Sequence, residues 1–274
     1  MTLTPGQVAD LLARHALTPS RALGQNFVAD PNTVRRIARL AEVGPQDRVL
    51  EIGPGLGALT LALVETGASV LAVEADRHLL PVLAEVLAGV DRVRVVHADA
   101  MTADWVDLLG SGTGWVMVAN LPYNIATPLV ADLLDGVPTI ARMLVMVQRE
   151  VGERLAAGPG DDAYGAVSVK VAYWSRAKVV ARVPASVFRP RPNVESVLVD
   201  IRRRPAPAVD PAAVSADRLF AVVRAGFATR RKMLRRALAD VVEPEAFALA
   251  GVAPESRAEE LDVEAWGRLA GAGR

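Results

Sequence analysis

The chain has 274 residues and a mass of 29.0 kDa, which is enough to bury one large core beside a small second one. Hydrophobic residues make up 51% and aromatic residues only 4%, so the core must rest on alanine, valine and leucine, as in an ordered α/β protein. The chain has no cysteine, which excludes disulfides, thiolate metal sites and a cysteine nucleophile. The sequence shows neither a signal peptide nor an apolar run of about 18 residues, so we expect a soluble, cytoplasmic protein.

Charge is divided strongly along the chain, although the net charge is zero. Residues 1–162 carry 12 basic and 19 acidic side chains, residues 163–236 carry 16 and 4, and residues 237–274 carry 3 and 8. The middle block is nearly all arginine, whose planar guanidinium matches the geometry of phosphate. This block predicts a polyanionic partner, with an ordinary solvated surface as the alternative.

Helices and strands alternate from the N-terminus. Thr4 opens an amphipathic helix with a capping box, and Asp30 caps a second helix that runs to about Glu42. Short valine-rich segments that are apolar on both faces then alternate with helices, which predicts parallel strands buried in a doubly wound α/β domain. The strands are predicted at 48–52, 69–73, 92–97, 115–119 and 140–147, and the helices at 58–65, 77–88 and 127–134.

A change of pattern near residue 202 predicts the domain boundary. Residues 178–183 and 194–201 are predicted to form a closing antiparallel pair of strands. A run of arginines and a Pro-Ala-Pro segment follow, and this composition is typical of a linker. We therefore predict a sheet domain at 1–202 and a small all-helical domain at 203–274.

The first predicted strand runs into a glycine-rich turn, Glu51–Gly57, with the spacing Gly-x-Gly-x-Gly. Dinucleotide-binding folds use Gly-x-Gly-x-x-Gly to place pyrophosphate at a helix N-terminus. The different spacing here, with a carboxylate two residues before the first glycine, favours a ligand that carries a positive ammonium and sulfonium and no phosphate. A plain strand–helix turn is the alternative.

Acidic residues also end the next two predicted strands. Glu74 is placed to accept both hydroxyls of a ribose, a role that it could equally serve for NAD, and Asp99 is placed to accept from an adenine amino group. Because the carboxyl ends of parallel strands meet at one crevice, we expect Glu51, Glu74 and Asp99 to converge on a single ligand.

The fourth predicted strand ends in Asn120-Leu121-Pro122-Tyr123. The Asn120 side-chain oxygen and the Leu121 carbonyl could accept both hydrogens of an adenine amino group, which would localise the lone pair on its nitrogen. Pro122 would fix the chain direction, and Tyr123 would offer a ring for stacking. Methyl transfer would then require mainly alignment of donor and acceptor, an effect that can supply about 7–11 kcal/mol.

These motifs together resemble the ribosomal RNA adenine dimethyltransferase family, and most closely its branch that acts on small-subunit (16S) ribosomal RNA. The resemblance covers nearly the whole chain and includes two further segments of the first domain and one of the second. The segments that carry it are Leu23–Phe27, Glu51–Gly57, Asn120–Tyr123, Phe188–Ser196 and Phe227–Leu234. It implies a Rossmann-like class I methyltransferase fold with a seven-stranded, mostly parallel sheet, and a small all-helical C-terminal domain.

The resemblance also implies roles for individual residues. The cofactor would be S-adenosyl-L-methionine, and the target base would lie against Asn120, Leu121, Pro122 and Tyr123, with Phe188 stacking on its other side. Val28, Asn193 and Glu195 differ from the residues that are common in the family. The implied cofactor contacts are Asn26, Val28, Gly53, Glu74, Asp99 and Asn120.

Basic residues in two places are candidates for contacts with RNA phosphates, which would position the RNA without reading its bases. Arg189 and Arg191 flank Phe188 in a proline-rich loop. The second group is predicted to form one basic helical face, and it consists of Arg230, Arg231, Lys232, Arg235 and Arg236. The three histidines form no ligand cluster, so we expect no metal site.

The sequence therefore predicts an S-adenosylmethionine-dependent enzyme that dimethylates the 6-amino group of two adjacent adenosines near the 3′ end of small-subunit ribosomal RNA. We expect it to act as a monomer on that RNA or on the immature 30S subunit, without a membrane or a metal. The alternatives are a large-subunit ribosomal RNA adenine dimethyltransferase and a non-catalytic ribosome-assembly factor. A DNA adenine methyltransferase and a nicotinamide dehydrogenase are disfavoured.

Overall fold

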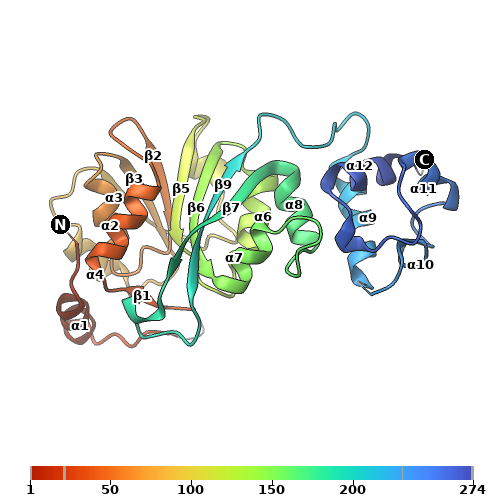
Figure 1. Cartoon of the computed structure of the whole chain (residues 1–274). Coiled ribbons are helices and arrows are strands. Elements are labelled where there is room, and N and C mark those ends of the chain that lie inside the picture. The colour runs from red at the N-terminus through yellow and green to blue at the C-terminus, as the bar shows by residue number, and fades with distance from the viewer. Residues whose placement is uncertain (1, 21–22, 230, 273–274) are drawn as a thin grey trace. The chain divides into compact units, whose positions relative to one another are not determined.

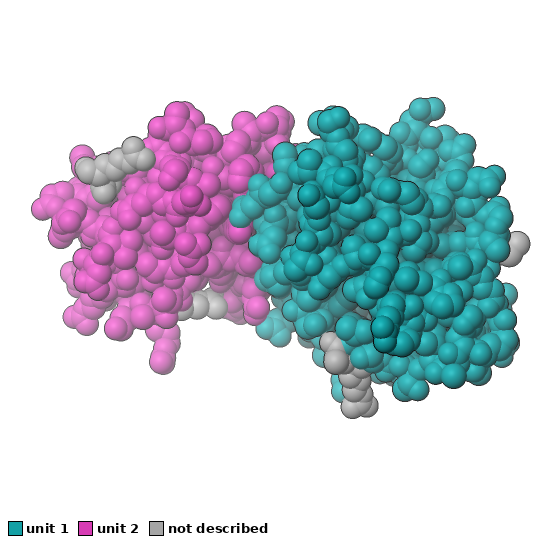
Figure 2. Space-filling view, turned by 180° about the vertical axis from the view of Figure 1, so that it is seen from behind, with its two compact units in different colours: residues 1–152, 179–201 teal, residues 153–178, 202–274 magenta. Residues whose placement is uncertain are grey.

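The computed structural model describes residues 2–20, 23–229 and 231–272 (Figure 1). The chain divides into two compact units, coloured separately in Figure 2. We call residues 1–152 and 179–201 the sheet unit, and residues 153–178 and 202–274 the helical unit. One crossing between the units, at residues 201 and 202, lies beside the predicted domain boundary. Residues 153–178, which are predicted in the first domain, group with the C-terminal helices instead.

A seven-stranded sheet forms the centre of the fold, with the strand order β4-β3-β2-β5-β6-β9-β7. The register of β2 with β3 and β5, of β3 with β4, and of β5 with β6 is parallel throughout. The predicted doubly wound α/β fold is therefore confirmed. The strands are β2 Arg48–Ile52, β3 Ser69–Glu74, β4 Val93–His97, β5 Trp115–Asn120, β6 Ile140–Gln148, β7 Ser175–Val183 and β9 Ser196–Arg203.

Helices precede or connect these strands, and those predicted from the sequence are present (Figure 1). The Thr4 capping box and the Asp30 N-cap are both formed, the latter with Thr33 N donating to Asp30 Oδ2 at 2.9 Å. Val118 and Leu144 in the central strands are completely buried, because helices cover the sheet. The helices up to β7 are α1 Pro5–Arg14, α2 Pro31–Leu40, α3 Ala58–Val64, α4 Leu80–Val86, α5 Trp105–Leu109, α6 Ala126–Gly136, α7 Arg149–Ala156 and α8 Ala166–Trp174.

A second, two-stranded sheet joins two distant parts of the chain. β1 (Phe27–Val28) pairs antiparallel with β8 (Phe188–Arg189), so that Phe27 lies opposite Arg189 and Val28 opposite Phe188. Strands of two residues have no periodicity, so the sequence did not predict them. The pairing brings together two of the segments that carry the family resemblance.

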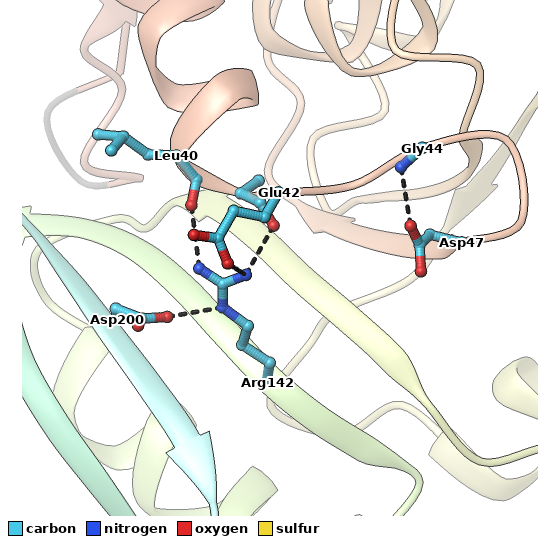
Figure 3. Close-up of polar contacts among 7 residues, drawn as sticks. Leu40, Glu42, Gly44, Asp47, Arg142 and Asp200 are labelled. Atoms are coloured by element: carbon cyan, nitrogen blue, oxygen red, sulfur yellow. Dashed lines mark hydrogen bonds and ion pairs between the residues drawn. The ribbon is translucent and has the colours of Figure 1, made fainter.

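Arg142 on β6 anchors the end of α2 to the sheet (Figure 3). Its Nε donates to Asp200 Oδ1 at 2.7 Å, and its Nη1 donates to the Ala41 carbonyl and to Glu42 Oε2, both at 2.9 Å. Its Nη2 donates to the Leu40 carbonyl at 3.0 Å. These carbonyls belong to the last turn of α2, where backbone acceptors have no partner within the helix. One side chain therefore caps α2 and ties it to β6 and β9.

The helical unit packs around Trp266, which is completely buried. Tyr164 and Tyr173 join this core from residues 153–178, and Tyr173 meets Phe220 edge to face with ring centroids 5.2 Å apart. This shared core explains why residues 153–178 group with the C-terminal helices. Those helices are α9 Ala216–Ala228, α10 Leu234–Ala237, α11 Pro244–Ala250 and α12 Val263–Ala272.

The predicted basic helix is wrong in its secondary structure. α9 ends at Ala228 and α10 begins only at Leu234, so Arg231 and Lys232 lie in the turn between the two helices. Arg230 lies outside the described residues. Within this turn, the backbone N of Lys232 donates a hydrogen bond to the Thr229 carbonyl at 2.7 Å. The basic side chains are therefore distributed over a turn and a short helix instead of one helical face.

Candidate active site

A cavity of about 270 Å³ lies in the sheet unit, at the carboxyl ends of β2, β3, β4 and β5. β2 and β5 are neighbours although they are not consecutive, so the cavity lies where the strand order reverses, which is the usual ligand position in such sheets. The structure brings together at its walls every residue that the resemblance assigned to the cofactor. These are Asn26, Val28, Gly53, Glu74, Asp99 and Asn120, and Pro122 lies beside them.

The glycine-rich turn after β2 has a left-handed backbone conformation that only glycine adopts readily. Gly55 has φ of +59° and Gly57 has φ of +85°. A Cβ atom on Gly55 would lie 2.8 Å from Phe27 Cδ1, so the turn and β1 approach closely across the cavity wall. Because these glycines have no side chain, a ligand can lie against the backbone of the turn, and the ring of Phe27 can pack against Gly55.

Glu51 is a buried carboxyl group in the cavity wall. It is only 1% exposed, and its Oε2 has no hydrogen-bond partner among the described residues. The pKa of Glu51 is raised to about 8, mainly by burial and to a smaller extent by the nearby charge of Glu74. A buried acceptor without a donor is costly, so this atom fits a positively charged or N–H group of a ligand.

Glu74 is held by the backbone on both carboxylate oxygens. Gly55 N donates to Oε2 at 3.1 Å and Asp76 N donates to Oε1 at 2.9 Å. Burial raises the pKa of Glu74, and these hydrogen bonds oppose the rise. Each oxygen of an ionised carboxylate has more than one lone pair, so Glu74 can still accept from two hydroxyl groups of a ligand.

Asp99 follows β4 and differs from the other two acids because it is exposed. Its Oδ1 accepts from Met101 N at 2.9 Å, which fixes the carboxylate at the rim of the cavity. The structure therefore places the three acids of consecutive strands around one cavity, with two of them buried and one at the edge.

Gln25 and Asp76 also line the cavity, and the sequence did not single them out. Gln25 Nε2 donates to Asp76 Oδ2 at 2.7 Å, and Gln25 Oε1 accepts from Ser20 N at 2.7 Å. This contact ties the N-terminal segment to the loop after β3. The sequence feature that could have pointed to Gln25 is its position inside Leu23–Phe27, one of the segments that carry the family resemblance.

Asn120 is the last residue of β5, and its amide projects between the strand end and the N-terminal segment. Its Nδ2 donates to the Asn26 carbonyl at 3.0 Å. Leu121 is buried, and its backbone N donates to the Met146 carbonyl at 3.1 Å. The Tyr123 hydroxyl lies 3.2 Å from Ser196 Oγ on β9, and burial raises the pKa of this phenol. Leu121 and Tyr123 are not among the residues that line the cavity.

Phe188, which the resemblance implies as a stacking residue for the target base, is completely buried. Its strand pairs with β1, and its ring packs in the main core of the sheet unit. It does not line the cavity in this structure, so no ring face is available to a base.

The candidate RNA-binding residues are exposed where the structure describes them. Arg189 and Arg191 lie in the sheet unit, and Arg189 Nη1 donates to the Phe188 carbonyl at 3.1 Å. Arg231 and Lys232 lie in the turn of the helical unit, and Arg235 forms an ion pair with Glu255 at 3.3 Å. A role in RNA binding stays a prediction for all of them.

The described residues hold neither a group of metal ligands nor a helix suited to cross a membrane. Outside residues 1, 21–22, 230 and 273–274, no three His, Cys, Asp or Glu side chains are grouped as metal ligands would be. Over the same residues, no helix has the length and apolarity needed to cross a membrane.

Comparison with known proteins identifies the family. The family model for ribosomal RNA adenine dimethylase matches residues 18–271. The ribosomal RNA small subunit methyltransferase A of Thermobifida fusca (strain YX) is 47% identical, over 98% of this chain and 95% of that protein. The protein of the same name from Streptomyces coelicolor is 48% identical, over 98% of this chain and 96% of its own length.

Solved structures agree with this result. The 23S rRNA methyltransferase ErmE is 28% identical, with a TM-score of 0.71 over 90% of this chain and 99% of that one. A dimethyladenosine transferase from Plasmodium falciparum, at 24% identity and a TM-score of 0.72, covers 88% of this chain and 94% of that one, and it supports the fold alone. The resemblance seen in the motifs is thereby confirmed, and the chain belongs to the ribosomal RNA adenine dimethylase family.

Proposed function

We propose that this protein is a ribosomal RNA (adenine-N6,N6)-dimethyltransferase that uses S-adenosyl-L-methionine. Its target is the 6-amino group of two adjacent adenosines near the 3′ end of small-subunit ribosomal RNA. The observation that carries the proposal is the position of Asn120, which lines the same cavity as the buried Glu51 and Glu74. The same cavity would therefore hold the cationic cofactor beside its acidic residues and present the amide oxygen of Asn120 to the target amine.

The residues at the cavity fit S-adenosylmethionine. Glu51 Oε2, buried and without a partner among the described residues, would accept from the ammonium group. Glu74 would accept from the ribose hydroxyls, and Asp99 from the adenine amino group at the rim. Gly53 and Gly55 would let the ligand approach the backbone. The cofactor supplies an electrophilic methyl group on a sulfonium, and the acidic cavity favours its positive charge.

The target amine would be activated by two acceptors. Asn120 Oδ1 and the Leu121 carbonyl receive no hydrogen bond from any described residue, so both can accept the hydrogens of the 6-amino group. The nitrogen then takes on tetrahedral character, and its lone pair points at the methyl group. The amine loses its proton readily once it is alkylated, so the site needs no dedicated base.

The base must leave its stack to reach the cavity, at a cost of a few kcal/mol. Pro122 would support it in the cavity, and the half-buried ring of Tyr123, just outside the cavity lining, would stack beside it. Phe188 can serve as the second stacking residue only after β8 moves out of the core. We therefore assign that step to the RNA-bound protein.

The small-subunit substrate is favoured over the large-subunit one by sequence identity. The relatives at 47% and 48% identity carry the name of the small-subunit enzyme, whereas the 23S rRNA methyltransferase is 28% identical. The arginine-rich residues 163–236 would hold the RNA phosphates. We propose that the protein acts as a monomer, in the cytoplasm, on the immature 30S subunit.

The test compares ribosomal RNA from cells that lack this protein with RNA from cells complemented by the wild type or by Asn120→Ala. Mass spectrometry of small-subunit RNA fragments should find two adjacent dimethyladenosines with the wild type and neither with the variant. Asn193→Ala, in an exposed loop, is the matched control and should restore both. Dimethyladenosine that persists in the deletion strain, or that is restored by Asn120→Ala, would refute the proposal.

A further inference from the structure

The side-chain amide of Asn120 has two different ends, and only one of them can activate an amine. Its oxygen can accept from the amine, whereas its nitrogen can only donate. The group that decides which end faces the cavity lies 94 residues away in the sequence, in the segment 24–27. Asn120 Nδ2 donates to the backbone carbonyl of Asn26 at 3.0 Å.

The chemistry of this contact determines the orientation of the amide. A backbone carbonyl accepts and never donates, so the atom 3.0 Å from it must be the nitrogen of Asn120. Because the amide is planar, its oxygen lies on the opposite branch. That oxygen has no donor among the described residues, and neither has the adjacent Leu121 carbonyl.

The Asn26 carbonyl is itself held on both sides. On its N-terminal side, Gln25 bridges Ser20 N and Asp76 Oδ2, each at 2.7 Å. Gly24 has φ of +63° and packs so closely that a Cβ there would lie 3.1 Å from Pro122 Cβ and 3.3 Å from Tyr123 N. The segment therefore rests directly on the loop that follows Asn120.

On its C-terminal side the next residue, Phe27, is fixed by two neighbours. It pairs with Arg189 across the two-stranded sheet, and its ring packs against Gly55 of the glycine-rich turn. The position of the carbonyl is therefore set by contacts with four separate parts of the sheet unit, and the Asn120 amide is oriented before any substrate arrives.

We propose that the Asn26 carbonyl is a positioning group, which orients the Asn120 amide so that Oδ1 faces the target amine and which requires asparagine instead of aspartate at position 120. The inference rests on the proposed function. An aspartate would keep an acceptor for the amine, but its second oxygen would face the Asn26 carbonyl, so two acceptors would meet. The carboxylate would rotate away and misplace the acceptor.

The first test is Asn120→Asp, assayed with purified protein, S-adenosylmethionine and unmethylated 30S subunits. We expect kcat to fall by about 100-fold or more, the size of effect seen when a preorganised polar group is lost. The cofactor Kd, measured by calorimetry, should change much less than kcat, because Asn120 is only one of the residues assigned to the cofactor. An aspartate variant with wild-type kcat would overturn the inference.

The second test displaces the segment without adding a charge. Gly24→Ala places a methyl group against Pro122 and Tyr123, and we expect kcat to fall by about tenfold because small displacements of a reacting group are costly. Gly89→Ala is the matched control, since Gly89 has φ of +74° but no atom within 4 Å of its Cβ position. Its kcat should equal that of the wild type, although both variants should lose some Tm because both glycines have positive φ.

The outcomes separate the two proposals. Equal kcat values for Gly24→Ala and Gly89→Ala would overturn the role of the Asn26 carbonyl and leave the proposed function intact. Wild-type protein that transfers no methyl group to small-subunit RNA would refute the proposed function itself.

Discussion

At the residue scale, the site depends on carboxyl groups whose ionisation is opposed by burial. Glu51 faces the cavity from a position that is 1% exposed, and its pKa is raised to about 8. At neutral pH without a ligand, this group therefore holds its proton in most molecules. A cationic ligand would favour the ionised form, so cofactor binding should release a proton from Glu51.

This coupling makes cofactor affinity depend on pH. We expect the Kd for S-adenosylmethionine to fall as the pH rises from 6 towards 8, by at most roughly tenfold per unit, because ionised Glu51 becomes available. The glutamine of Glu51→Gln cannot ionise. The variant therefore shows how much of the pH dependence comes from the ligand's own amine. Calorimetry of both proteins across this range measures the difference, and parallel curves would contradict the role of Glu51.

The same pKa has an effect of known sign on stability. Between the ordinary pKa of a glutamate, near 4.5, and the folded value of about 8, the folded protein holds a proton that the unfolded chain has released. Rising pH therefore destabilises the fold over this window, and the effect levels off above it. The Tm of the wild type minus that of Glu51→Gln should decrease from pH 5 to pH 8 in thermal melts.

At the element scale, single contacts determine whether a helix stays in place. Arg142 joins the end of α2 to Asp200 on β9, with side-chain exposures of only 12% and 3% (Figure 3). Buried ion pairs are costly to break by removing one partner, since the remaining charge has lost its counter-ion. Exposed pairs contribute little, because water already solvates both groups.

Removal of the Arg142 guanidinium should therefore destabilise the fold strongly. We expect Arg142→Met to lower the free energy of unfolding by about 3–5 kcal/mol in urea denaturation. Arg35→Met breaks an exposed pair with Glu65 and should cost less than about 1 kcal/mol. Adding Asp200→Asn to the first variant should recover part of the loss, and no recovery would show that capping of α2 is the larger contribution.

Close packing in the helical unit leads to a similar expectation for α9. A Cβ on Gly226 would overlap the ring of Trp266, which is completely buried and cannot move freely. Gly226→Ala should lower the free energy of unfolding by about 1–3 kcal/mol. Gly136→Ala, at a helical glycine with no atom within 4 Å, should be neutral or slightly stabilising, so equal effects would contradict the packing argument.

At the scale of the whole molecule, the distribution of charge separates the two tasks of the protein. The acidic part of the chain, residues 1–162, contains the cavity that we propose for the cationic cofactor, and the basic part, residues 163–236, contains the candidates for phosphate contacts. A net charge of zero therefore does not argue against RNA binding. Salt dependence is the property that reports such contacts, because each neutralised phosphate releases counter-ions.

Alanine at Arg230, Arg231 and Lys232 together should weaken RNA binding and lower the slope of log K against log salt by about 2. Cofactor affinity should not change. Arg92→Ala with Arg94→Ala, two exposed arginines of the acidic part, is the control and should leave the slope unaltered. Filter binding at several salt concentrations measures this, and an unchanged slope in the triple variant would exclude these residues from the RNA contact.

The sequence alone determined the parts of this protein that depend on neighbours along the chain. β2 begins and ends at the predicted residues, and the acids that follow the strands surround one cavity, because burial on both faces and the ends of parallel strands leave clear local patterns. Helix α8 was not predicted, since its valine-rich sequence is equally typical of a strand.

Only the tertiary structure decided the contacts between distant segments. Three features depend on residues that are far apart in the sequence. These are the burial of Phe188, the pairing of β1 with β8, and the place of residues 153–178 in the helical core. The bond from Asn120 to the Asn26 carbonyl belongs to the same class. A sequence pattern shows which groups a residue carries, but the direction in which an amide points depends on the atom that folding places beside it.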